Sequence, residues 1–71
     1  MSSKLISPMP GNVISINVAV GDHVIAGQSC AVVEAMKMQN SLTIGRDGIV
    51  KAVYVKAGDK VADEDLLIEL E

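Results

Sequence analysis

The sequence of 71 residues predicts an all-β domain: a pair of small antiparallel sheets, with about four short strands in each half of the chain. Ten Val and seven Ile accompany one Tyr and no Phe or Trp, and branched aliphatic side chains favour the pleated strand. Apolar residues also recur with a period of two, and no long stretch keeps the period of 3.6 that a helix needs. The third observation is an internal repeat.

The repeat appears when the sequence is aligned with itself at an offset of 37, which lays residues 5–34 over residues 42–71 without a gap. Eight of these 30 pairs are identical, whereas chance at this composition gives roughly two or three. The identical pairs are Leu5/Leu42, Gly11/Gly48, Val13/Val50, Val18/Val55, Gly21/Gly58, Asp22/Asp59, Val24/Val61 and Glu34/Glu71. We therefore expect one domain over residues 1–71, built from two similar halves that residues 35–41 connect.

Alternating strands lie between matching turn signals in the two halves. The alternation runs from Ile14 to Val20 in the first half and around Val53 to Val55 in the second. Glycine in such turns accepts a positive φ, and an aspartate closes a turn through its side chain. The turn signals are Pro8-Met9-Pro10-Gly11 and Gly45-Arg46-Asp47-Gly48 before these strands, and Gly21-Asp22 and Gly58-Asp59 after them.

Strand positions that are apolar in both halves form the predicted core. These pairs are Val13/Val50, Ile16/Val53, Val18/Val55, Val24/Val61, Ala31/Ile68 and Val33/Leu70. Cys30 pairs with Leu67 in an apolar run, which indicates core packing rather than redox chemistry. His23 follows a Gly-Asp turn and Tyr54 matches a polar residue of the first half, so we expect both to face solvent.

The duplication also predicts where the ends of the chain lie. Residues 35–41 join the end of the first half to the start of the second, so those two ends must lie close together. If a pseudo-twofold axis relates the halves, the end of the second half lies equally close to the start of the first. The termini are then neighbours at one pole of the domain. Lys37, in the connecting segment, projects from the opposite pole.

The connecting segment is predicted to be the tip of a hairpin, because strand residues Val32-Val33 and Leu42-Thr43-Ile44 flank it. A two-residue turn places Met36 and Lys37 at its corners. Both corners of such a turn need a positive φ, which favours Asn-Gly or Asp-Gly. Met-Lys is a poor local choice, and a local rule broken at an exposed tip indicates a function.

Composition excludes several classes of function. A formal net charge of −3 and the near absence of aromatic residues argue against nucleic-acid binding. No apolar run approaches the length of a membrane span, so we expect a soluble domain without a membrane partner. A single Cys excludes an internal disulfide, and one His beside one Cys leaves no plausible zinc site.

The segment Glu34-Ala35-Met36-Lys37-Met38 resembles the biotin attachment sequence of biotinyl carrier domains. The resemblance extends over the whole chain, through Ser7-Pro8-Met9-Pro10-Gly11, both Gly-Asp turns and the Glu-Leu-Glu ending. It implies a flattened β-barrel or sandwich of two four-stranded sheets, with biotin joined to Lys37 through an amide bond.

Within that family, the chain most resembles the C-terminal domain of acyl-CoA carboxylase α subunits, the propionyl-CoA carboxylase type above all. Ser-Pro-Met-Pro-Gly and the Met-Gln-Asn-Ser that follows the lysine carry this likeness. The short stretch from Asn17 to Val24 leaves no room for the thumb loop of the bacterial acetyl-CoA carboxylase carrier. Pyruvate and methylcrotonyl-CoA carboxylases remain open. A eukaryotic parent implies the mitochondrial matrix, and any other parent the cytoplasm.

The resemblance also implies the chemistry. An exposed lysine is protonated at neutral pH and is then a weak nucleophile. No group fixed beside Lys37 by the sequence removes that proton, so a separate biotin protein ligase is implied, with Ala35, Met36 and Met38 shaping the hairpin that it recognises. Biotin then carries CO2 from a biotin carboxylase centre to a carboxyltransferase centre acting on an acyl-CoA. The domain itself supplies no catalytic residue, and we expect it to be a monomer in isolation.

Two other functions compete with this one. A lipoyl carrier shares the fold and the duplication, but lipoyl domains usually present Asp-Lys-Ala at the tip, where this chain has Met-Lys-Met. An unmodified interaction module would use the same scaffold as a spacer, and leaves the lysine between two methionines unexplained.

Overall fold

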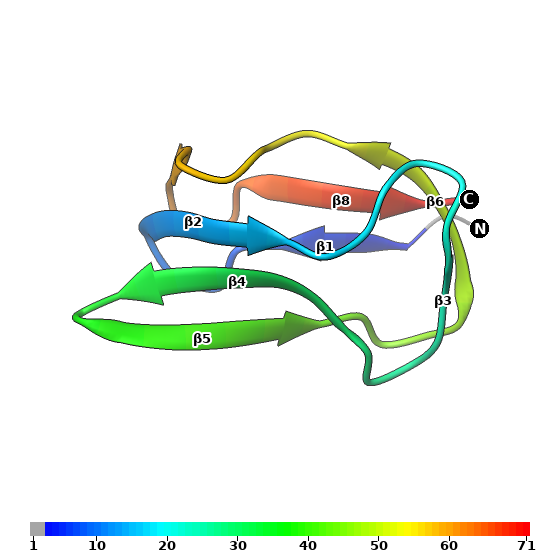
Figure 1. Ribbon diagram of the computed structural model, residues 1–71, viewed down its shortest axis with the longest axis horizontal. Helices are drawn as coiled ribbons and strands as arrows, with labels where there is room; N and C mark the ends of the chain where they lie inside the picture. Colours follow the sequence, from blue (N-terminus) through cyan, green and yellow to red (C-terminus); the bar gives the residue numbers. More distant parts are fainter. Residues whose placement is uncertain (1–2) are drawn as a thin grey trace.

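Eight strands form two four-stranded antiparallel sheets in the computed structural model, which describes residues 3–71 (Figure 1). The strands are β1 Lys4–Ile6, β2 Gly11–Ile16, β3 His23–Val24, β4 Ser29–Ala35, β5 Met38–Thr43, β6 Gly48–Val53, β7 Lys60–Val61 and β8 Leu66–Leu70. One sheet has the order β1-β8-β6-β3 and the other β5-β4-β2-β7. The predicted all-β class is therefore confirmed, as a flattened sandwich. Over the same residues, no helix has the length and hydrophobicity of a membrane span.

The two sheets correspond to each other through the offset of the repeat. A shift of 37 residues carries β1, β2, β3 and β4 onto β5, β6, β7 and β8, although β5 starts earlier in its half than β1 does. The same exchange converts the strand order of the first sheet into that of the second. This agreement supports an internal duplication as the origin of the fold.

A bulge in each half breaks the simple alternation. The register of β2 against β4 shifts between Val13 and Ser15, so Ile14 stands outside the pairing and is 41% exposed. The register of β6 against β8 shifts at the equivalent place, which leaves out Lys51. An extra residue in one strand reverses the side chains beyond it. The alternating apolar run from Ile14 to Val20 is consequently not one buried face, and both of these end residues are exposed.

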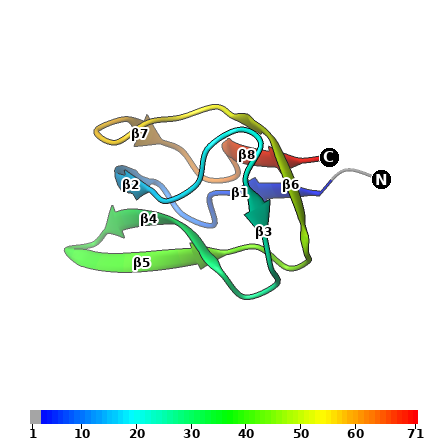
Figure 2. The same ribbon diagram turned by 45° about the vertical axis from the view of Figure 1, so that its right-hand side comes forward.

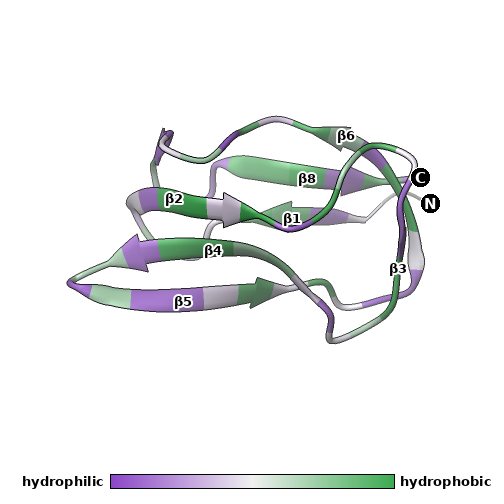
Figure 3. Cartoon of the chain, viewed as in Figure 1, coloured by the Kyte–Doolittle hydropathy of each residue, from purple (hydrophilic) through white to green (hydrophobic). Residues whose placement is uncertain are grey.

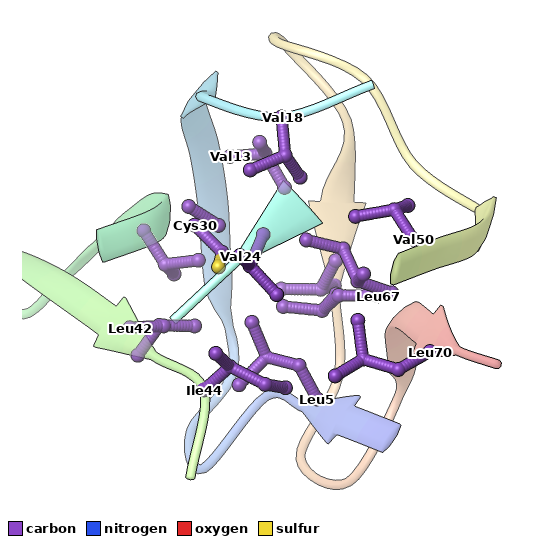
Figure 4. Close-up of a cluster of buried hydrophobic side chains, with 14 residues drawn as sticks. Leu5, Val13, Val18, Val24, Cys30, Leu42, Ile44, Val50, Leu67 and Leu70 are labelled. Atoms are coloured by element: carbon purple, nitrogen blue, oxygen red, sulfur yellow. The ribbon is translucent and has the colours of Figure 1, made fainter. Parts of the chain in front are cut away.

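The core lies between the sheets and draws side chains from both (Figure 4). Most residues of the predicted core are buried, whereas Ile16, Val53 and Val55 are half-buried and pack against its edge. The core also contains Leu5, Leu42, Ile44 and Leu67, which the list of predicted core pairs did not name. Cys30 packs in the core as expected. Hydropathy along the chain shows the same division, since β4 is hydrophobic at its centre and its neighbour β5 is mostly hydrophilic (Figure 3).

Gly11 lets β2 pass very close to β4 near the turn of the β4–β5 hairpin. A Cβ atom at this residue would lie 2.3 Å from the carbonyl oxygen of Glu34, which is part of the backbone and cannot turn aside. Its equivalent in the repeat, Gly48, would place a Cβ atom 3.0 Å from a side-chain methyl of Leu70. Glycine at residue 11 therefore sets how closely β2 supports the hairpin.

The ends of the described chain lie together, as the pseudo-twofold argument predicted. The amide of Leu70 donates to the carbonyl of Ser3 at 2.7 Å. The guanidinium of Arg46 contacts both ends, donating through Nε to Ser3 Oγ and through Nη2 to the Glu71 carbonyl at 2.5 Å. The β4–β5 hairpin reaches the other end of a molecule that is 32 Å long, in both views (Figures 1 and 2).

Candidate functional site

A tight turn joins β4 to β5, as the sequence predicted. Ala35 pairs with Met38, and only Met36 and Lys37 lie between them. Their φ angles are 52° and 65°, so both corners adopt the left-handed conformation that this type of hairpin turn requires. Side chains larger than glycine or asparagine rarely occupy that region, and holding two of them there is unfavourable by about 1–3 kcal/mol each.

The side chains of the turn divide between core and solvent. Ala35 is buried at the end of β4, which fixes the base of the turn. Met36 is 94% exposed and Met38 is 66% exposed, although methionine normally packs against apolar neighbours. Lys37 is exposed between them and forms no hydrogen bond or ion pair with any residue from 3 to 71. The amine is therefore displayed with apolar groups on either side.

The strands below the turn hold it rigidly. Pairing between β4 and β5 runs from Ser29 and Thr43 up to the turn itself. The side-chain amide of Asn40, on β5, donates to the carbonyls of Val33 at 3.4 Å and Met38 at 3.2 Å. Sequence reasoning did not single out Asn40. The signal was present, because residue 40 falls opposite Val33 once the turn at residues 36 and 37 is counted.

The site offers an attachment point rather than a binding cavity. The structure has shallow hollows of about 300 Å³ beside β3, lined by residues 23–25 and 47–49, and about 250 Å³ beside residues 53–56 and 59. Neither includes a residue of the turn. The fit to a covalently carried group is nevertheless good, because the Lys37 amine can be acylated without displacing a neighbour among residues 3–71.

The other residues considered in the sequence occupy the expected surroundings. Cys30 is 1% exposed, and burial raises the pKa of its thiol. His23 is exposed at the start of β3. Tyr54 faces outward and donates from its hydroxyl to a carboxylate oxygen of Glu69 at 2.8 Å, a hydrogen bond that raises the tyrosine pKa. None of them pairs or forms a side-chain hydrogen bond with a described residue of the turn.

Comparison with known proteins shows the family to which the chain belongs. Residues 3–70 match the sequence profile of a family described as biotin-requiring enzyme. The chain belongs to this biotin-requiring family. Over 70 residues it is 59% identical to the mitochondrial propionyl-CoA carboxylase alpha chain of Mus musculus, which covers 99% of this chain and 10% of the mouse protein. The biotin-requiring domain thus spans about a tenth of that relative.

A short relative and a solved structure agree with the family. The biotin/lipoyl attachment protein of Bacillus subtilis is 44% identical over 62 residues, covering 87% of this chain and 85% of that protein. The crystal structure of Kluyveromyces lactis urea carboxylase superposes with a TM-score of 0.93 at 32% identity, over 100% of this chain and 6% of that one. The fold expected from the resemblance, a barrel-like sandwich of the biotin-requiring type, is therefore confirmed.

Proposed function

We propose that Lys37 is the residue of this domain to which biotin is covalently attached, and that the domain acts as a carboxyl carrier. The position of the lysine carries the proposal, since it stands exposed between Met36 and Met38 on a strained turn at the pole opposite the chain ends. Membership of the biotin-requiring family supports it. Biotin attached there would supply the ability to take up CO2 at one catalytic centre and release it at another.

The residues around Lys37 explain why a partner enzyme has to attach the group. The ammonium must lose a proton before it can attack an activated acid. Glu34, the acidic residue of the hairpin, belongs to β4 and lies opposite Gln39, two pairs below the turn. We therefore propose that a biotin protein ligase supplies the base. Met36 and Met38 give that ligase an apolar contact, and burying one such side chain contributes about 1.5–3 kcal/mol.

The two poles of the domain suit a mobile carrier. The chain ends, where a longer protein would attach, lie together at one pole, and the turn between β4 and β5, which carries Lys37, lies at the other. A domain tethered in this way can present its tip to successive sites, and tethering raises the effective concentration of the arm at each of them. We propose a biotin carboxylase and a carboxyltransferase of the parent carboxylase as these partners.

We propose an acyl-CoA, and propionyl-CoA in particular, as the compound that the parent enzyme carboxylates. The identity of 59% with the mouse propionyl-CoA carboxylase alpha chain supports this substrate. That relative is described as mitochondrial, so a eukaryotic parent would place the domain in the mitochondrial matrix and a bacterial parent in the cytoplasm. Residues 1–71 would form one carrier domain, with half repeats 5–34 and 42–71 and the biotin hairpin at 35–41.

Intact mass after co-expression with a biotin protein ligase and ample biotin tests the proposal. The parent domain should gain the mass of one biotinyl group, and Lys37→Arg should gain none. Lys51→Arg is the matched control, because Lys51 is also an exposed lysine but lies within strand β6 and has no flanking methionines. A biotinyl group retained by Lys37→Arg would show that the attachment site is elsewhere.

A lipoyl carrier is the second candidate function. The Bacillus subtilis relative is described as a biotin/lipoyl attachment protein, so lipoyl stands beside biotin in the description of a 44% identical protein. Co-expression with a lipoate ligase and lipoate, read by the same intact mass, separates the two. A lipoyl increment without a biotinyl one would replace the proposed cofactor, and no increment with either ligase would favour an unmodified interaction module.

A further inference from the structure

The sulfur atoms of residues 3–71 differ sharply in their exposure. Cys30 is sealed in the core, and its raised pKa keeps the thiol protonated. Met9 is half-buried in the connection between β1 and β2. Met36 and Met38 are largely exposed and stand on either side of Lys37. The sulfur that an oxidant in solution can reach is therefore concentrated at the hairpin tip.

We propose that Met36 and Met38 form a peroxide-sensitive modification site, whose oxidation to methionine sulfoxide lowers the acceptance of Lys37 by the biotin ligase. Part of this inference rests on the proposed function, because its consequence concerns the attachment of biotin. The selectivity of the oxidation itself depends only on the exposure of the side chains.

The oxidation needs one equivalent of a hydroperoxide. A lone pair of the thioether sulfur attacks one peroxide oxygen, the O–O bond breaks, and an S–O bond forms. Hydrogen peroxide is reduced to water, and the sulfur loses two electrons. Methionine sulfoxide reductases reverse the change, removing the oxygen as water with electrons from thiols, so the modification is reversible.

The consequence follows from the change in polarity. A sulfoxide oxygen is a strong hydrogen-bond acceptor, whereas the thioether that it replaces is nearly apolar. A ligase surface shaped for the apolar tip would bury that oxygen without a donor, which is unfavourable. The fold should not change, because Met36 and Met38 contribute little to the core and the strands below the turn are paired independently of these side chains.

The first experiment maps the oxidation without any ligase. The purified domain without biotin is treated with increasing hydrogen peroxide, and peptide mass spectrometry measures the sulfoxide at each methionine. Met36 and Met38 should be oxidised several times faster than Met9, while Cys30 stays reduced and circular dichroism stays unchanged. Oxidation of Met9 at the same rate as the tip would overturn the selectivity on which the site depends.

The second experiment measures the initial rate of biotinylation by the ligase before and after oxidation, with the peroxide removed. The rate for the parent should fall about tenfold, or 1.4 kcal/mol. It should recover after treatment with two methionine sulfoxide reductases, one for each epimer of the sulfoxide. Each variant is compared with its own untreated sample. The double variant Met36→Leu, Met38→Leu should lose nothing on treatment, and Met9→Leu should behave like the parent.

The outcomes separate this inference from the proposed function. A parent with both tip methionines oxidised that accepts biotin at its untreated rate would refute the modification site, as would an equal loss of rate in the Leu double variant. An untreated parent that takes no biotin would overturn the proposed function and the predicted effect on the ligase together. The mapped order of oxidation would still decide whether the tip is the reactive sulfur site.

Discussion

Three residues other than glycine adopt a positive φ in the described chain, and they have different reasons for it. Met36 and Lys37 do so at the turn that displays the amine, so their strain accompanies the proposed attachment site. Glu64, with a φ of 70°, lies in an exposed turn at the position that the repeat matches with Gly27, whose φ is 87°. At that residue the second half keeps an unfavourable conformation without a site to explain it.

Glu64→Gly should therefore stabilise the domain. Glycine adopts this φ freely, and the backbone hydrogen bond from the Glu64 amide to the Ser7 carbonyl, 2.7 Å long, does not involve the side chain. We expect the free energy of unfolding to rise by about 0.5–1 kcal/mol in urea titrations. Asp63→Gly is the control, because its φ is not positive and glycine there should lower stability. A loss of stability in Glu64→Gly would show that the Glu64 carboxylate stabilises the folded domain by more than the positive φ destabilises it.

Cys30 gives a prediction about pH. Burial raises the pKa of its thiol above the ordinary value of 9.0, with a smaller opposing effect from a backbone hydrogen bond to Ile44. The thiol of the unfolded chain therefore ionises at a lower pH than that of the folded chain. Its contribution to the free energy of unfolding is complete below about pH 9 and is lost as the pH rises through the folded pKa.

Alkylation with iodoacetamide checks the state of Cys30. At pH 8 the native domain should react about tenfold or more slowly than the domain unfolded in guanidinium chloride, because the thiol is 1% exposed and protonated. The native rate should rise only at strongly alkaline pH, as stability falls. Equal rates in the native and unfolded domains would contradict both the burial and the protonation assigned to this residue.

At the scale of elements, the central strands of the two halves share a starting glycine and a bulge, but the two glycines have different neighbours. Each half begins its central strand with a glycine, Gly11 in β2 and Gly48 in β6, and each carries a bulge three residues later. The neighbours of the two glycines differ, since Gly11 meets the backbone of the hairpin and Gly48 meets a side chain. Only the first half has a hairpin to support, so the closer approach occurs where the site is.

Gly11→Ala and Gly48→Ala should consequently differ in effect. The added methyl at residue 11 would meet the Glu34 carbonyl at 2.3 Å, which forces β2 away from β4, and we expect a loss of about 2–4 kcal/mol in the free energy of unfolding. The methyl at residue 48 would meet the Leu70 side chain, which can move, so we expect the free energy of unfolding to fall by only about 1 kcal/mol. Thermal unfolding of both variants measures the difference, and equal losses would refute the argument from backbone contact.

The sequence predicted the strands, the turn and the poles more reliably than the packing. The branched residues, the glycine turns and the repeat are local or periodic signals, and they led to eight strands and to a turn at residues 36 and 37. The bulges at Ile14 and Lys51 depend on the partner strand, so the alternation along the sequence could not show where the pairing is interrupted. The hydrogen bond from Asn40 to the Val33 carbonyl follows from the register that the turn at residues 36 and 37 sets between β4 and β5, a signal that the sequence analysis did not use.

At the scale of the whole molecule, function depends on keeping the two poles separate. The pseudo-twofold arrangement gives the hairpin pole a continuous chain through Met36 and Lys37, while the equivalent pole has two chain ends. No covalent link holds those ends within the domain. The Arg46 side chain instead bridges the two ends through its hydrogen bonds to Ser3 and Glu71. These hydrogen bonds add to the pairing of β1 with β8 at this pole.

Arg46→Ala should loosen the pole of the chain ends and leave the hairpin unaffected. The amide of Leu70, which is bonded to the Ser3 carbonyl at 2.7 Å, should exchange with deuterium about tenfold faster as β1 frays from β8. The backbone amide of Asn40, in the β4–β5 ladder, should keep its exchange rate, and the ligase should biotinylate Lys37 at the parent rate. Lys51→Ala, which removes an exposed cation from the bulge in β6, serves as the control for charge. Faster exchange throughout the hairpin, or a matching fall in biotinylation, would show that the two poles are coupled and that the carrier does not isolate its tip from its tether.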